Sequence, residues 1–158
     1  MTHNGIVYAV GGGGTSLAIK AGGRGDVTKT HVLWRTAKGS NASSPIYLDG
    51  TLYWVSESGG ALHFQDAETG KSVEHRLGPD VGRIWASPIL ADGKLYFVSQ
   101  FKGVYVVAAK RVGAKEKFEP LAHNVFDDDK SRSNASLAVS DGQLFLRNDQ
   151  HLYCIGKR

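Results

Sequence analysis

One short motif occurs four times along the chain and constrains its fold more than any other feature. Each copy reads Asn or Asp, then Gly, any residue, an aliphatic residue and an aromatic residue, at positions 4–8, 49–53, 92–96 and 141–145. The motif glycines Gly5, Gly50, Gly93 and Gly142 follow one another at intervals of 45, 43 and 49 residues. Such a period indicates a repeat architecture. Asn-Gly or Asp-Gly between apolar runs also predicts a β-hairpin, because Gly supplies the positive φ that the turn needs.

Further apolar runs surround each motif at matching distances. A short run precedes the last three motifs, in SSPIYLDG, ASPILADG and ASLAVSDG, and Pro45 and Pro88 suit the first residue of a strand. A third run follows each motif, at 17–19, 62–64, 104–107 and 152–155. A fourth run follows in the first three units, at 31–34, 72–77 and 118–121. Each unit is therefore predicted to be a four-stranded antiparallel meander.

The predicted strands are apolar on both faces in several places, such as residues 52–55 and 95–98, which indicates sheets covered on both sides. A period in the forties with four strands per unit is typical of a β-propeller. We predict an all-β fold: a β-propeller segment of about three and a half four-stranded antiparallel blades. It forms a single partial β-propeller domain over residues 1–158, with blade units at about 1–36, 40–78, 84–122 and 133–158.

The glycine run at residues 11–14, followed by Thr15 and Ser16, suggests a loop that binds phosphate. It has neither the Gly-Lys-Ser/Thr ending of a P-loop nor a G-x-G-x-x-G that opens a helix. We therefore interpret it as a hairpin between the second and third strands of the first unit.

The repeat resembles that of the quinoprotein-like (PQQ-repeat) β-propeller family. Residues 43–71, SSPIYLDGTLYWVSESGGALHFQDAETGK, fit its S-P-x-x-x-D-G-x-L-Y, Gly-led strand and Asp-Ala-x-Thr-Gly-Lys turn, and Trp34 stands where the family ends its fourth strand with Trp. The ending DGQLFLRNDQHLYCIGKR is similar to the last blade of such proteins. The resemblance implies one of two kinds of protein: dehydrogenases that hold pyrroloquinoline quinone and calcium, or non-enzymatic members similar to the outer-membrane assembly lipoprotein. The dehydrogenases use two adjacent cysteines, whereas this chain has only Cys154.

We therefore expect a non-catalytic module for protein or ligand binding and assembly, with no cofactor. By family resemblance it is bacterial and periplasmic or otherwise extracytoplasmic. Two alternatives stay open: a fragment of a PQQ-dependent sugar or alcohol dehydrogenase, and a sensor segment of a signalling protein. The net charge of +4 is mild and the basic residues are scattered, so we expect no nucleic-acid partner. The sequence contains no apolar run long enough for a membrane span, and Cys154, within an apolar run, is expected to be buried.

The predicted units hold three, four, four and three strands, which is fewer than four whole blades. We interpret the chain as the C-terminal half of a larger propeller, in which the first strand of the first unit lies upstream. Two sheet edges and the faces of the terminal blades would then be open to a protein partner or to self-association. A homodimer completing a ring of about seven or eight blades is one such arrangement.

The first strand of each blade lies nearest the propeller axis, so residues shortly before these strands are expected at one mouth of the channel. Trp85 and Asn134 occupy such positions, three residues before Pro88 and Leu137. An exposed Trp85 flanked by Arg83 would suit contact with a sugar, a quinone or a peptide by stacking. The alternative is that Trp85 packs between blades.

Two further loop residues are candidate contacts. Arg24 lies in the polar, glycine-rich loop of the first unit, and Asp128 lies in the acidic run 127–129. This run lacks the alternating Asp and Gly of a calcium loop, so we expect a solvated loop with Lys130 and Arg132 as its local partners. The six histidines show no zinc-ligand spacing.

Overall fold

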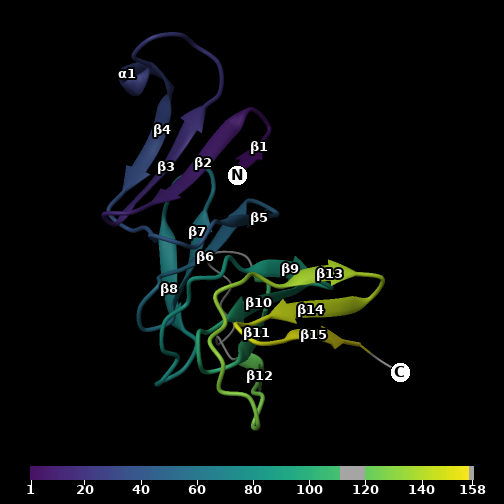
Figure 1. Cartoon of the computed structure of the whole chain (residues 1–158). Coiled ribbons are helices and arrows are strands. Elements are labelled where there is room, and N and C mark those ends of the chain that lie inside the picture. The colour runs from purple at the N-terminus through teal and green to yellow at the C-terminus, as the bar shows by residue number, and fades with distance from the viewer. Residues whose placement is uncertain (111–119, 157–158) are drawn as a thin grey trace.

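The computed structural model describes residues 1–110 and 120–156, which form four antiparallel sheets that follow one another along the chain (Figure 1). Within each sheet the spatial order of the strands is their order in sequence. Sheet 1 contains β1 (Thr2–His3), β2 (Ile6–Gly11), β3 (Thr15–Lys20) and β4 (Val32–Thr36). Sheet 2 contains β5 (Ile46–Leu48), β6 (Thr51–Val55), β7 (Ala61–Asp66) and β8 (Ser72–Arg76). Sheet 3 contains β9 (Ile89–Ala91), β10 (Lys94–Val98), β11 (Val104–Ala108) and β12 (Pro120–Asn124), and sheet 4 contains β13 (Ala138–Ser140), β14 (Gln143–Arg147) and β15 (Leu152–Ile155).

The repeated motif forms the first hairpin turn of every sheet, as predicted. The residue before each motif glycine has φ between 45° and 49°, and all four glycines also have positive φ. Two successive residues with positive φ make the turn whose twist matches that of antiparallel strands. The glycine-rich run 11–14 likewise joins β2 to β3 as a hairpin, because Gly11 pairs with Thr15.

The strand boundaries correct the prediction in three places. Sheet 1 has four strands instead of three, because Thr2 and His3 pair with Val7 and Ile6 as β1. A one-turn helix, α1 (Thr28–His31), stands within the expected loop and takes His31 from the predicted strand, so β4 begins at Val32. The fourth strand of sheet 3 ends at Asn124 rather than at residue 121, and residues 118 and 119 of the predicted strand lie outside the described residues.

The hydrophobic core lies between neighbouring sheets rather than inside any one of them. Sheets 1 and 2 bury Tyr8, Ala18, Leu52 and Ala67 between them. The largest cluster fills the space between sheets 2 and 3, and a third joins sheet 3 to sheet 4; their central aromatic and aliphatic members are Tyr53, Phe64, Phe97, Val98 and Leu146. Because each sheet packs on the next, the strands of sheets 2 and 3 are apolar on both faces. No helix in the described part of the chain has the length and apolar character to cross a bilayer.

Candidate functional site

The first strands of sheets 2, 3 and 4 are tied together by a chain of serines at the positions just before them. The backbone N–H of Ser44 donates to Ser87 Oγ at 3.0 Å, and the N–H of Ser87 donates to Ser136 Oγ at 2.9 Å. These serines are equivalent in the repeat, since each stands immediately before Pro45, Pro88 or Leu137. The segments that lead into the innermost strands therefore lie next to one another, where a channel mouth was expected.

Gln100, at the tip of the β10–β11 hairpin, brings two of the predicted contact residues together. Its backbone N–H donates to the carbonyl of Arg83 at 2.8 Å, and its side-chain Nε2 donates to Asn134 Oδ1 at 2.8 Å. The Arg83 and Asn134 side chains are both exposed. Trp85, two residues after Arg83, is 39% exposed and belongs to none of the core clusters of the described residues. Sequence reasoning missed Gln100, because hairpin tips carry no signal for contacts to other repeats.

A cavity of about 370 Å³ lies beside this hairpin, between sheets 3 and 4. Its walls are the β10–β11 hairpin, the loop 125–133, and residues of β14 and the turn after it. Phe101 and Val125 line it and are 60% and 52% exposed. Lys130 and Asp127 also line it, and the described residues give neither of them an ion pair. The cavity thus offers an apolar contact and both signs of charge, which suits a polypeptide segment.

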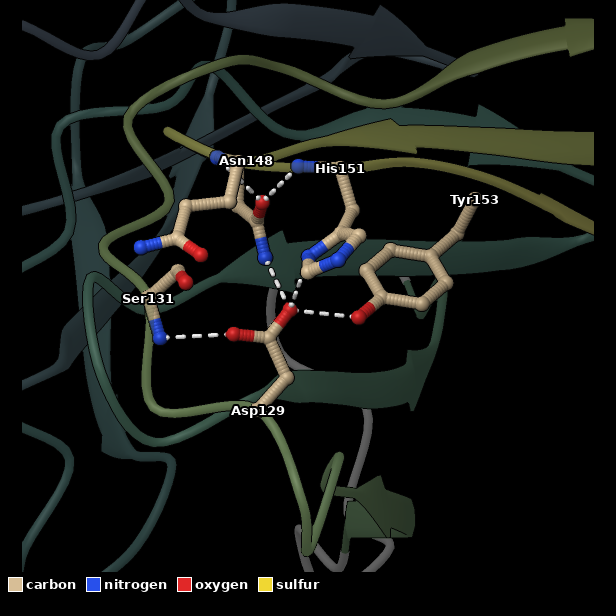
Figure 2. A network of polar contacts seen from close by, with 6 residues as sticks. Asp129, Ser131, Asn148, His151 and Tyr153 are labelled. Atoms are coloured by element: carbon tan, nitrogen blue, oxygen red, sulfur yellow. Dashed lines mark hydrogen bonds and ion pairs between the residues drawn. The ribbon is translucent and has the colours of Figure 1, made fainter.

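Asp129 fixes one wall of this cavity by joining the loop to the last hairpin. Figure 2 shows its carboxylate facing Asn148, His151 and Tyr153. Oδ2 accepts from Asn148 Nδ2 at 2.6 Å, lies 3.0 Å from His151 Nδ1 and accepts from the Tyr153 hydroxyl, while Oδ1 accepts from the N–H of Ser131 at 2.8 Å. Four donors on one carboxylate favour its ionised form.

The charge of this network follows from its hydrogen bonds. The hydrogen bonds from Ser131 and Tyr153 hold the pKa of Asp129 far below its usual range. The same carboxylate raises the pKa of the Tyr153 phenol, because it accepts the proton that ionisation would remove. Tyr153 also stacks on Phe126, with ring centroids 4.3 Å apart. These contacts of Asp129 therefore anchor the loop 125–133, which forms one wall of the cavity, to the β14–β15 hairpin.

These contacts correct the expected partners of the acidic loop. Arg132 pairs with Asp149 of the β14–β15 turn at 3.1 Å, and Lys130 faces the cavity instead of a neighbouring carboxylate. Asp128 is exposed, and the hydrogen bonds of Asp129 described above do not involve it. Arg24 lies in the β3–β4 loop, which carries α1 and stands at the far end of the molecule from sheet 4 (Figure 1). Over residues 1–110 and 120–156, no group of three or more His, Cys, Asp or Glu side chains is placed to hold a metal ion.

The outer faces of the two terminal sheets form a second kind of surface. In sheet 1, Tyr8 and Ala18 point toward sheet 2, so the alternate residues point away from it. This outward face carries Val7, Ala9, Leu17, Ile19 and Val32, together with the exposed Arg35, which pairs with Leu17.

In sheet 4, Leu146 and Tyr153 point toward sheet 3, so Phe145, Arg147, Leu152 and Cys154 point outward. Cys154 is therefore exposed and not buried as predicted, because the described residues place no neighbouring sheet over this face. Leu152 is 70% exposed for the same reason.

No family model matches the chain, and no curated protein matches it significantly. Solved structures do match it. BamB from Moraxella catarrhalis has a TM-score of 0.69 and 11% identity over 96% of this chain and 42% of BamB, so the chain spans less than half the length of that protein. The computationally designed Ika4 protein has a TM-score of 0.67 and 14% identity over 98% of this chain and 88% of Ika4. The N-terminal domain of Nup159 has a TM-score of 0.55 and 11% identity over 95% of this chain and 40% of that domain. At these identities the likeness concerns the fold alone: the chain is an all-β segment of a β-propeller.

Proposed function

We propose that this chain is a non-catalytic β-propeller module for protein binding and assembly, and that two copies close a ring head to tail. The observation that carries the proposal is the pair of largely apolar outward faces on sheets 1 and 4, on which Arg35 and Arg147 are charged residues. By the resemblance of its repeat, the module belongs with the non-enzymatic quinoprotein-like proteins of the bacterial periplasm or another extracytoplasmic compartment.

The two outward faces match because the repeat defines what each must meet. Within the chain, Tyr8 and Ala18 of sheet 1 share a core cluster with Leu52 of sheet 2. Phe145 and Cys154 form the equivalent pair in sheet 4, since each pair joins the motif aromatic residue to the third strand. Val7 in sheet 1 is the equivalent of Leu52, since each precedes the motif aromatic residue. The sheet that sheet 4 needs as its neighbour thus has the pattern of sheet 1.

In a dimer, each copy provides its sheet 1 as the neighbour of the other copy's sheet 4. If sheet 4 of each copy packs on sheet 1 of the other, the two contacts are identical and the assembly closes with twofold symmetry. The ring then holds eight sheets, twice the four of one chain, a number common among β-propellers. Closure covers Cys154, Leu152 and Phe145, which are otherwise left in contact with water. The cavity between sheets 3 and 4 stays open to a protein partner.

Light scattering after gel filtration, over a range of concentrations, tests the ring. We expect a dimer, and an Ile19→Glu variant, which places a charge on the outward face of sheet 1, is expected to be a folded monomer by circular dichroism. A matched Lys20→Glu variant changes an exposed residue of the same strand and is expected to stay dimeric. A wild-type monomer at every concentration would refute ring closure.

Cross-linking tests which faces meet. A Val7→Cys variant treated with a short bismaleimide is expected to give covalent dimers through Cys154 of the other copy. A Leu33→Cys variant places the new thiol on an exposed residue of β4 outside the outward face, and we expect far less cross-linking. Equal cross-linking of the two variants would contradict the head-to-tail arrangement.

The absence of catalysis has a separate test. We expect no saturable binding of pyrroloquinoline quinone in the presence of calcium, and no dye-linked oxidation of glucose or simple alcohols. Reproducible oxidation would favour the dehydrogenase-fragment alternative, whatever the oligomeric state.

A further inference from the structure

Sheets 1, 2 and 3 each end in an outer fourth strand, and sheet 4 has none among the described residues. The outer strands β4, β8 and β12 pair in the same way with the third strand: Trp34 is opposite Ala18, Val73 opposite Phe64, and Ala122 opposite Val106. Cys154 of β15 is the equivalent third-strand residue, because it pairs with the motif aromatic residue Phe145. The repeat therefore defines a strand position alongside β15 that the described residues leave unfilled, with a known direction and register.

The backbone of β15 offers hydrogen bonds at that position. The N–H of Asn148 donates to the carbonyl of His151 at 3.0 Å, so these two residues form a hydrogen-bonded pair of the β14–β15 ladder. In an antiparallel ladder such pairs alternate with pairs whose backbone groups point away from each other. Leu152 and Cys154 belong to the second kind, so their N–H and C=O groups point to the free edge.

The sequence of β15 is that of an interior strand. The outer strands carry a charge or a proline, namely Arg35 in β4, Glu74 and Arg76 in β8, and Pro120 in β12. Such residues discourage the pairing of an exposed edge with another chain. β15, with the sequence LYCI, has neither. At the perimeter of sheet 4, β15 therefore presents an edge without the charge or proline that the outer strands of the other sheets carry.

The outward face beside this edge also has an unmatched charge. Arg147 pairs with Leu152 in the register of sheet 4, so the two side chains lie on one face. Arg147 is exposed, and no ion pair to it occurs among the described residues. An added strand would place the residue opposite Leu152 on this same face, within reach of the long arginine side chain.

We infer that β15 is a strand-addition site for a partner protein: it binds an extended segment, antiparallel to β15, with an apolar residue opposite Cys154 and an acidic residue opposite Leu152. Main-chain hydrogen bonds supply the affinity and alternate side chains supply the specificity, as in other cases of strand addition. The main-chain hydrogen bonds of this site do not compete with ring closure, because outer strands lie at the perimeter of a propeller. The two specifying side chains would lie on the outward face of sheet 4, which closure packs against sheet 1 of the other copy.

A peptide derived from the outer strand β8 of this chain serves as the probe. β8 places Val73 opposite the equivalent of Cys154 and His75 opposite the equivalent of Leu152. The probe is the sequence of residues 71–77 with glutamate in place of the histidine, KSVEERL, carrying a fluorophore. Binding to the whole chain is measured by anisotropy, and hydrogen exchange reports on the Leu152 and Cys154 amides. We expect saturable binding and slower exchange at these two amides.

Backbone methylation provides the matched control. Methylation of the valine nitrogen, which faces β15, is expected to weaken binding at least about tenfold, whereas methylation of the next nitrogen, which faces away, is expected to change it less than about twofold. A lysine in place of the second glutamate is expected to bind about fivefold more weakly, and Arg147→Ser to remove that difference.

If the free peptide binds too weakly to measure, a fusion of the peptide to the protein tests the same site. The same peptide is fused to the chain after Arg158 through a flexible Gly-Ser linker, which raises its effective concentration to the millimolar range. No protection of the Leu152 and Cys154 amides in the fused chain would overturn the proposal, as would equal effects of the two methylations. Self-association of the Ile19→Glu variant through β15 would also overturn it, because the edge would then bind a second copy. Loss of the ring with retained peptide binding would leave this site standing.

Discussion

Acidification is expected to destabilise this protein through one buried histidine, His63 of β7. Its side chain is 3% exposed and lies flat on Trp54, with ring centroids 3.8 Å apart. Nε2 lies 3.2 Å from Ser56 Oγ, and Nδ1 is a buried nitrogen with no hydrogen-bond partner among the described residues. A protonated imidazole would need a partner at both nitrogens, so this site favours the neutral ring.

The magnitude follows from the pKa. Burial lowers the pKa of His63 from 6.5 to about 4; the charge of Glu74 opposes this shift and that of Lys38 adds to it. The unfolded chain, with its ordinary pKa, therefore takes up the proton first as the pH falls. The contribution of neutral His63 to the free energy of unfolding is fully present above about pH 6.5 and is lost progressively down to about pH 4. With 1.36 kcal/mol for each unit of pKa, the loss reaches about 3 kcal/mol.

Urea unfolding at a series of pH values from about 7.5 to about 4, followed by circular dichroism at one protein concentration, measures this loss. His63→Phe keeps an aromatic ring on Trp54 and removes the titration. Other groups titrate in both proteins, so the informative quantity is the difference in unfolding free energy between them. We expect the difference to change by about 3 kcal/mol across this range, to the disadvantage of the wild type at low pH.

Ser56→Ala serves as the control, because it removes the hydrogen bond to Nε2 and leaves the histidine able to titrate. It is expected to lower stability at neutral pH and to keep the pH dependence of the wild type. A difference between wild type and His63→Phe that stays constant with pH would refute the reasoning, since the burial of His63 would then carry no proton linkage.

Three further changes test the packing of the sheets. Gln65→Leu is expected to lower the free energy of unfolding by about 3 kcal/mol in urea, because Gln65 is fully buried and accepts from the Trp54 indole N–H and donates to the Gly70 carbonyl, and the leucine can do neither. An unchanged midpoint would contradict this. Gly103→Ala is expected to lower the free energy of unfolding by about 3 kcal/mol or more, because φ is +79° and the new methyl group overlaps a backbone carbonyl of β12. The control Gly93→Ala, with φ of +66° and open space around it, is expected to lower it by about 1 kcal/mol. Equal losses in the two variants would contradict the clash. Asp129→Ala is expected to lower the melting temperature and to speed proteolysis within the loop 125–133, and a variant with the loop still protected would show that Asp129 is not its anchor.

The sequence predicted the parts of the fold that depend on local chemistry. Asn4, Asp49, Asp92 and Asp141 adopt positive φ before glycine in every unit, and this turn chemistry is legible in the motif itself. β1 was missed because Thr2 and His3 are two polar residues with no apolar pattern. Its pairing depends on the motif that follows, which folds the chain back onto β2.

The candidate site was predictable only where the repeat fixes a position. Periodicity brought Asn134 and Arg83 to neighbouring segments, as their shared contact with Gln100 shows. The anchor at Asp129 was not predictable, because it joins a loop to residues about twenty positions later through side-chain geometry. A run of three aspartates indicates a polar loop, and it does not indicate which of them will be held.

The failure at Cys154 has a more general physical cause. A repeat gives each copy the same apolar pattern whether or not a neighbour covers it, so Cys154 in β15 has the same pattern as Val106 in β11. Val106 is buried against the next sheet and Cys154 is exposed. An apolar position that is buried in the interior copies and exposed in the last copy therefore marks a face that no described sheet covers. Sheet 1 shows the same effect more weakly, because Val7 is half-buried whereas the equivalent Leu52 is fully buried. In the proposed ring, the other copy would cover both Val7 and Cys154.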